Sequence, residues 1–304
     1  MTDFELNLQA AFYSDGIAAN VLKQDENSAQ ELLAGFVAAL FVLLEGREVA
    51  ALSQTQLRVL VSKFNKSVKK DLTDFSVQTD TKLETLFKSL DIFWLKFLTG
   101  MAGKKLTRRE PVTWQQSKDR YIGAGIRAVD VLDRFTTSIA FNLQQAVVTA
   151  NTTGLKNSEL RANIFALGGR FKAGTRAALV TLSTFARSII SWGIGGELFT
   201  HFQWQSIIDE RTTPFCLDRH MQIFPATETV LPPAHYYCRS SIYWLNLSDK
   251  PAQKNYSRAE YSDMLANDAV FRKDYDAGGK RATSNITPTE LANNLLSKRN
   301  TENA

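Results

Sequence analysis

Apolar residues recur every three or four positions along most of the chain before residue 198, which is the spacing of an amphipathic helix. This pattern predicts helices over residues 54–75, 81–100, 125–151, 157–167 and 174–192. Residues 28–45 are apolar nearly all round, which indicates a helix buried among others. Gly46 ends that helix, and Thr81 with Glu84 has the spacing of a capping box that begins the helix over residues 81–100.

The pattern changes after residue 198. Residues 202–208 and 241–245 are rich in the aromatic and β-branched residues that are typical of strands, and prolines mark loops between them. We therefore expect a mainly helical body followed by a small α+β lobe with two to four short strands. The predicted fold class is mainly α with this small lobe.

The same changes predict three parts along the chain. Residues 1–155 would form a helical body, and residues 156–248 would form a domain that holds the lobe and its helical approach. Residues 249–304 read as a polar tail with short helices over 257–268 and 287–297, where Thr287 is a cap and Pro288 suits a first turn. Residues 278–281 would be a flexible linker between those two helices.

Composition narrows the classes of protein. A chain of 304 residues with 44% hydrophobic and 22% charged residues is typical of a folded protein. The net charge of +5 permits an anionic partner such as DNA without requiring one. Two cysteines make no disulfide framework, which favours a reducing compartment, and the start has no pattern of a cleavable signal. The longest uncharged apolar run, Leu32 to Leu44, is shorter than the roughly 20 residues that span a bilayer, so we expect no membrane partner.

Candidate chemistry is concentrated between Ile207 and Ile242, which holds both cysteines, two of the three histidines and four of the seven prolines. Cys216 and His220 stand four apart, and His235 and Cys238 stand three apart. Two thiolates and two imidazoles can close a tetrahedral zinc site that joins the two strands. Alternatively, the cysteines are reduced thiols buried as small hydrophobes, and packing and hydrogen bonds join the strands.

The stretch also has a distinctive order of residues, written as D-x-R-T, P-x-C, a short strand ending in F-P, and P-P-x-H-x-x-C-R. This order resembles the signature of the phage Mu F-like minor head proteins, also called the head morphogenesis family. The matching positions are Asp209, Arg211, Thr212, Pro214, Cys216, Pro233, His235, Cys238 and Arg239. Met221 stands where the family usually has a glycine, and Thr213 stands where some members have another cysteine.

The resemblance implies a minor capsid protein that binds near the portal inside the phage head. Its role would be in head assembly, with DNA packaging or ejection as a further role. The implied partners are the portal protein, other head proteins and phage DNA, and the implied location is the head interior after assembly in the host cytoplasm. No catalytic residue carries over from the family, so the resemblance implies that the chain is not an enzyme.

Two alternatives remain open. One is a zinc-dependent hydrolase or nuclease, with Asp209 or Glu210 as base if one histidine is free, because a catalytic zinc keeps a position for water. The other is a DNA-binding module that contacts phosphates or an acidic partner through a basic loop after residue 100. The cations of that loop are Lys104, Lys105, Arg108 and Arg109. The simpler interpretation of the same loop is a solvated connection.

Overall fold

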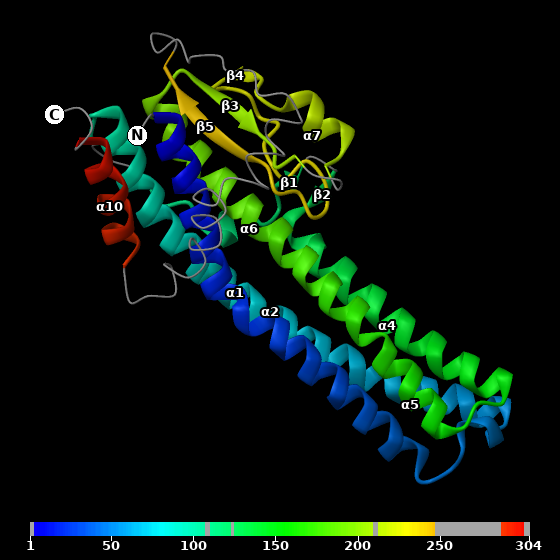
Figure 1. Cartoon of the computed structure of the whole chain (residues 1–304). Helices are drawn as coiled ribbons and strands as arrows, with labels where there is room; N and C mark the ends of the chain where they lie inside the picture. The colour runs from blue at the N-terminus through cyan, green and yellow to red at the C-terminus, as the bar shows by residue number, and fades with distance from the viewer. Residues whose placement is uncertain (1–2, 107–109, 123–124, 209–211, 247–286, 301–304) are drawn as a thin grey trace. The chain divides into compact units, whose positions relative to one another are not determined.

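The computed structural model describes residues 3–106, 110–122, 125–208, 212–246 and 287–300. These residues are mainly helical, and their strands form one antiparallel sheet of two strands and one of three (Figure 1). This confirms the expected fold class. Three strands lie after residue 198, within the expected two to four.

Five helices make up most of the described chain: α1 (Asp3–Leu44), α2 (Gln54–Ala102), α4 (Ala128–Thr153), α5 (Asn157–Ala166) and α6 (Gly168–Leu198). The shorter helices are η1 (Val49–Ala51), α3 (Trp114–Ser117), α7 (Pro214–Arg219) and α10 (Pro288–Asn300). The strands are β1 (Tyr121–Ile122), β2 (Ile126–Arg127), β3 (His201–Gln205), β4 (Ile223–Pro225) and β5 (Ser241–Leu245).

Contacts group the chain into two compact units, each assembled from separate stretches. We call Leu22–Thr81 with Val129–Leu179 the bundle unit. We call Met1–Val21, Lys82–Ala128 and Val180–Ala304 the lobe unit. The sequence analysis predicted three consecutive parts with boundaries at residues 155 and 248, whereas each of these units combines separate stretches. The three-part division stays a prediction.

The core of the bundle unit is a set of apolar stripes from its helices. Buried members include Phe36, Leu40, Leu57, Leu60, Phe64, Val68, Phe135, Ile139, Leu143, Leu160 and Ile164. The ring of Phe135 contacts those of Phe75 and Phe171, which joins α2, α4 and α6. Asn157 joins the start of α5 to the turn after α1, because its side-chain amide donates to Arg47 O and accepts from Val49 N. The helical periodicity of the sequence is therefore the source of this core.

Two expectations for the helices were wrong. The capping box at Thr81 does not begin a helix, because α2 runs through it and the Thr81 hydroxyl donates to Val77 O one turn earlier. No glycine or proline interrupts residues 76–80, so nothing stops the helix there. The helix over residues 28–45 is part of the longer α1 and is not buried all round, since Val42 is 74% exposed. Only the stripe that includes Phe36 and Leu40 is covered.

In the lobe unit, β3 is the central strand of the order β4-β3-β5, and both pairings are antiparallel. Phe202 of β3 lies opposite Phe224 on one side and Trp244 on the other, so three aromatic residues cross the sheet in one row. Gly195 lets α6 approach this sheet, because a Cβ at that position would lie 1.9 Å from the Trp244 ring.

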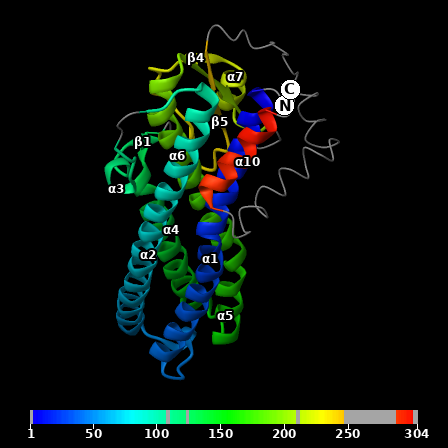
Figure 2. The same cartoon turned by 90° about the vertical axis from the view of Figure 1, so that its left-hand side faces the viewer.

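The last described helix, α10, lies beside the end of α2 in the lobe unit (Figures 1 and 2). Leu291, Ala292 and Leu295 are buried, and Leu296 packs over Gly100, where a Cβ would lie 2.4 Å from it. Thr287 caps its start, as the sequence predicted, and Glu290 completes a capping box with it. The predicted helix over residues 257–268 and the linker over 278–281 lie outside the described residues.

One stretch of the described chain, Asn157–Leu198, is long and apolar enough to cross a membrane by length and composition alone. Its most apolar window is 78% buried within the structure, and the core helices of globular proteins pass the same test. The expectation of no membrane partner stays a prediction.

Candidate metal centre

The first half of the signature stretch places Cys216 on α7. Thr213 precedes this helix and Pro214 occupies its first turn, where a missing N–H has no cost. The hydroxyl of Ser206, which follows β3, donates to Cys216 O at 2.7 Å and accepts from the Trp204 indole N–H at 3.1 Å. These bonds fix Cys216, which is 1% exposed, against the end of the central strand.

The second half places His235 and Cys238 in the loop before β5, and α6 holds this loop. The Thr181 hydroxyl accepts from Tyr237 N at 2.8 Å, and the Thr184 hydroxyl donates to Cys238 O at 2.8 Å. Arg187 donates to Ser240 O at 3.2 Å and pairs with Asp15 of α1. Successive turns of one helix therefore position the backbone of this loop.

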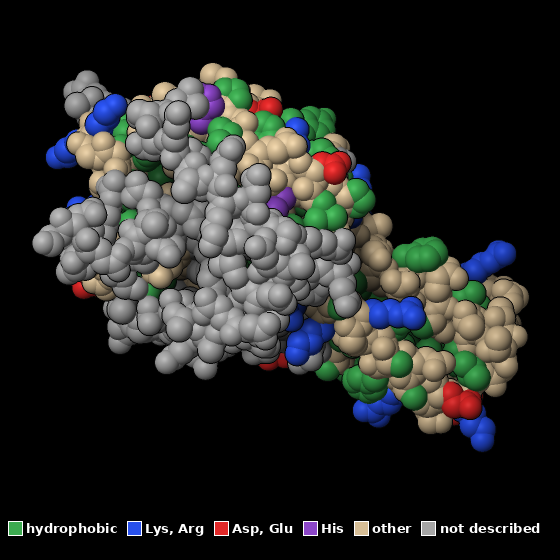
Figure 3. Space-filling model, turned by 45° about the horizontal axis from the view of Figure 1, so that its top comes forward, with side chains coloured by type: hydrophobic (Ala, Val, Ile, Leu, Met, Phe, Trp, Pro, Cys, Tyr) green, Lys and Arg blue, Asp and Glu red, His purple; other side chains and the backbone are tan. Residues whose placement is uncertain are grey.

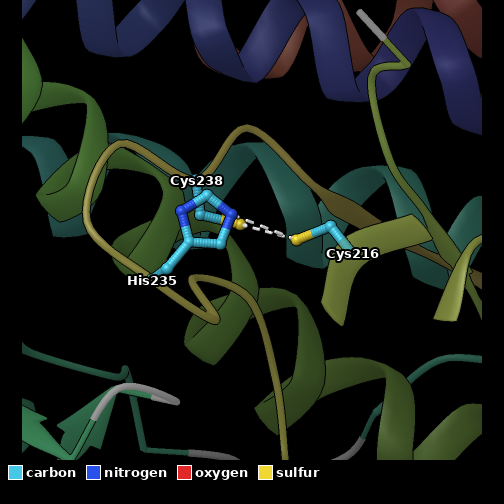
Figure 4. Close-up of side chains that lie close together, drawn as sticks. All are labelled: Cys216, His235 and Cys238. Atoms are coloured by element: carbon cyan, nitrogen blue, oxygen red, sulfur yellow. Dashed lines mark hydrogen bonds between the residues drawn. The ribbon is translucent and has the colours of Figure 1, made fainter. Parts of the chain in front are cut away.

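Together these elements bring three ligand atoms into one group (Figure 4). The Sγ atoms of Cys216 and Cys238 lie 3.8 Å apart, and His235 Nε2 lies 3.2 Å from Cys216 Sγ. A tetrahedral zinc bound at about 2.3 Å by two thiolates would separate the sulfurs by about 3.8 Å. Cys216, His235 and Cys238 therefore form a group that can hold a metal ion.

The contacts around the group suit a metal ligand set. His235 Nδ1 lies 2.9 Å from Tyr236 O, and since a carbonyl can only accept, Nδ1 carries the proton. The lone pair of the neutral ring is then on Nε2, which faces the sulfurs. The Ser240 hydroxyl donates to Cys216 Sγ at 3.4 Å, a contact that stabilises negative charge on sulfur.

The two thiols do not titrate alike. The hydrogen bond between them raises the pKa of Cys216 and lowers the pKa of Cys238, so the first negative charge resides on Cys238. The Cys238 sulfur in turn raises the pKa of His235. A thiolate and an imidazole whose ligand atoms lie within 4.8 Å of each other can bind a cation, for which protons compete.

His220, the fourth ligand of the sequence hypothesis, is not in the group that the described residues form. Its Nδ1 accepts from Ser206 N at 3.2 Å, so that nitrogen is already used. Burial lowers the pKa of His220 to about 4, which leaves its ring neutral near pH 7. The structure thus assembles a set of three ligands where the sequence offered four.

Thr212, Pro233 and Arg239 are further signature residues that the structure describes. Thr212 donates to Ile207 O at 2.7 Å, and Pro233 is buried. The Arg239 guanidinium lies over the Tyr237 ring at 5.9 Å. Asp209 and Arg211, and the candidate base Glu210, lie outside the described residues.

Sequence reasoning missed the polar side chains of α6 that hold the site. They are Thr181, Thr184 and Arg187, with Ser191 on the same helix holding the sheet, and all four are buried. Ser191 accepts from the Trp244 indole N–H at 2.8 Å. The available signal was their spacing of three and four residues within an otherwise apolar helix, which places them on one face.

It also missed Arg219 of α7, whose guanidinium lies 4.9 Å from the ring centroid of Phe215 and 4.8 Å from that of Phe224. This stack packs α7 against β4 through cation–π contacts. In the predicted basic loop, Lys104 and Lys105 are exposed, and Arg108 and Arg109 lie outside the described residues.

No protein-family model matches this sequence, and no curated protein or solved structure matches it significantly. The resemblance to the Mu F-like proteins therefore rests on the signature residues themselves.

Proposed function

We propose that this chain is a minor structural protein of a phage head, of the Mu F-like kind, whose lobe is held together by one zinc ion. The portal protein, other head proteins and phage DNA are the partners that this proposal implies. Its site of action would be the head interior, and its role would be in assembly, with DNA packaging or ejection as a further role.

The observation that carries the proposal is the meeting of Cys216 with His235 and Cys238. These residues stand at the two ends of the signature, about 20 residues apart, and their ligand atoms lie within 4.8 Å of one another. A loop rich in proline and polar residues buries too little apolar surface to fix itself. A shared ion would supply that free energy directly, since binding a structural metal is coupled to folding.

The burial of the group favours a structural ion over a catalytic one. Cys216 is 1% exposed and Cys238 is 0% exposed, so a substrate has little access to a metal held between them. Catalytic zinc needs a water that the substrate can reach and a base beside it. Cys216, His235 and Cys238 would hold the ion, and α6 would fix their backbone.

A zinc-dependent hydrolase or nuclease remains the second candidate for one specific reason. The group has three protein ligands, and three ligands with one position left for water is the pattern of catalytic zinc sites. Zinc-dependent cleavage of DNA, abolished by His235→Asn, would favour the enzyme over the structural protein.

Elemental analysis tests the metal. We expect about one zinc per chain in the purified protein, lost in Cys216→Ser and His235→Asn. His220→Asn is the matched control, because it changes a neighbouring histidine outside the group and should retain the ion. Zinc should also dissociate as pH falls, since protons compete for the thiolates and for the imidazole. If the protein is folded but metal-free at neutral pH, packing and hydrogen bonds join the strands of the lobe without zinc.

Mass spectrometry of purified heads tests the function. We expect peptides of this chain in mature heads of the phage that encodes it, at far fewer copies than the major capsid protein. The purified protein should also be retained on rings of the portal protein. Absence from both proheads and mature heads would contradict the proposal even if zinc is present.

A further inference from the structure

The outer face of α2 in the bundle unit carries a concentration of positive charge to which the proposed function assigns no role. No acidic residue occurs from residue 49 to residue 70. The cations in this stretch are Arg58, Lys63, Lys66, Lys69 and Lys70, and all five are exposed. We call them the α2 basic face.

Helix geometry places these cations together. At 100° per residue they fall within one arc of α2, opposite the buried stripe that includes Leu57, Leu60 and Phe64. At 1.5 Å per residue, the distance from Arg58 to Lys70 along the helix is about 18 Å. The positive charges therefore form a row parallel to the helix axis.

The charge of this row is not neutralised within the described structure. None of the five cations forms an ion pair with a described carboxylate. The next acidic residues along α2 are Asp71, which is half-buried, and Asp74, which lies beyond the row. Figure 3 shows the same bias more widely, with Lys and Arg side chains more frequent than acidic ones over the visible face of the bundle helices.

We propose that the α2 basic face binds the phosphate backbone of double-stranded DNA. A duplex is a linear polyanion with a charge about every 1.7 Å along its axis, so a straight row of cations about 18 Å long meets phosphates along its whole length. Four of the five cations are lysines, which act as point charges and contact phosphates without reading bases. Binding is then independent of sequence.

The composition of the face disfavours a membrane surface. A helix that lies in a bilayer interface presents large apolar or aromatic residues beside its cations. The exposed large hydrophobic residues described on this side of α2 are Val59 and Val77. This inference rests on the proposed function, which implies phage DNA as a partner, and it names the surface that would contact that DNA. The face lies in a different unit from the candidate metal centre, so a failure to bind DNA would leave the tests of zinc and of the phage head unaffected.

The experiment compares two variants with the same change of net charge, using the full chain and a mixed-sequence DNA duplex. The test variant carries Arg58→Gln, Lys63→Gln, Lys66→Gln, Lys69→Gln and Lys70→Gln. The matched control replaces five exposed cations of the α5–α6 region by glutamine, at Lys156, Arg161, Arg170, Lys172 and Arg176. Both sets are five exposed cations of the bundle unit and remove the same charge from different surfaces.

If all five cations contact phosphates, the affinity of the unaltered protein for the duplex should fall roughly 500-fold between 50 and 200 mM salt. This follows from a slope of about −0.9 per contact in the logarithm of affinity against the logarithm of salt concentration. The test variant should lose less than about tenfold over the same range and bind more weakly at 50 mM, while the control keeps the slope. If the larger variant fails to fold, Lys66→Gln with Lys70→Gln should still lower the slope by about 1.8.

Three outcomes would overturn the proposal. Equal losses in the test variant and the control would show a general effect of net charge. An unchanged slope in a folded test variant would place DNA contact elsewhere, with Lys104 and Lys105 as the next cations to replace. Stronger binding to vesicles that contain phosphatidylserine than to DNA would assign the face to an anionic membrane.

Discussion

The helices of the bundle unit and the loops after β3 in the lobe unit are held by different kinds of contact. In the bundle, buried apolar residues recur along every helix, so the same packing repeats turn after turn. In the lobe, the fold after β3 depends on a few particular bonds, such as those from Thr184 to Cys238 O and from Ser206 to Cys216 O. Both units have a buried apolar core, but the loops that follow β3 depend on these few bonds, whereas the bundle helices are held by apolar packing along their whole length.

This difference decides what a substitution does in each unit. Removing apolar volume from the bundle should cost free energy in proportion to the cavity, wherever in the stripe it is made. Changes in the lobe should depend on the individual position, because backbone geometry and single hydrogen bonds hold its loops. The following substitutions compare the two units, and the free energy of unfolding is measured by denaturant titration in each case.

The largest loss is expected in the bundle core. Phe64 is 0% exposed, and Phe64→Ala should lower the free energy of unfolding by about 3 to 5 kcal/mol, because it removes a buried ring and leaves a cavity. Val59 lies on the same helix and is 50% exposed, so Val59→Ala should change it by less than about 0.5 kcal/mol. Similar effects at both positions would mean that the stripe does not stabilise the bundle.

Replacing a helical glycine by alanine should change the free energy of unfolding in opposite directions in the two units. Gly195→Ala should cost about 1 to 3 kcal/mol, because its Cβ would overlap the Trp244 ring and separate α6 from the sheet. Gly35→Ala in the bundle meets nothing within 4 Å and should stabilise by up to about 1 kcal/mol through helix propensity. If both substitutions stabilised the protein, the close approach of α6 to β5 would be refuted.

A smaller loss is expected for one hydrogen bond in the lobe. Thr184→Val keeps the side-chain shape but removes the donor to Cys238 O, which should cost about 1 kcal/mol. If the lobe holds zinc as proposed, the affinity of the site for zinc should also fall about tenfold or more, because Thr184 supports the backbone of a metal ligand. Thr152→Val is the control, since Thr152 is exposed and bonds only within its own helix. Equal losses of unfolding free energy in the two variants would contradict the inference that Thr184 of α6 supports the loop of Cys238.

The two units also differ in how far the sequence predicts them. The stripe of α2 could be read from Leu57, Leu60 and Phe64, because helix packing depends on local periodicity. The failure at Thr81 has the same origin, since a capping box is a local pattern and the helix on both sides was stable enough to continue through it.

The candidate metal centre was predictable in its residues but not in its number of ligands. Spacing alone grouped His220 with Cys216, yet α7 ends at Arg219 and His220 Nδ1 is used by Ser206 N. The α6 residues Thr181 and Thr184 could not be linked to the loop from sequence, because their partners lie more than 50 residues away. Contacts between distant backbone and side-chain atoms leave no local pattern.

An effect of similar size is expected at Met221, where the resembling family usually has glycine. Its φ is +65°, in the left-handed region that favours glycine, and its backbone is fixed because Met221 N donates to Trp204 O at 2.8 Å. Met221→Gly should therefore be more stable than Met221→Ala by about 1 kcal/mol, since both lose the side chain and only alanine keeps the strained Cβ. In the bundle the preference is reversed, because Gly35 lies within a regular helix. An alanine variant as stable as the glycine variant would show that the turn after α7 relaxes, and that this loop is less rigidly held than its hydrogen bonds indicate.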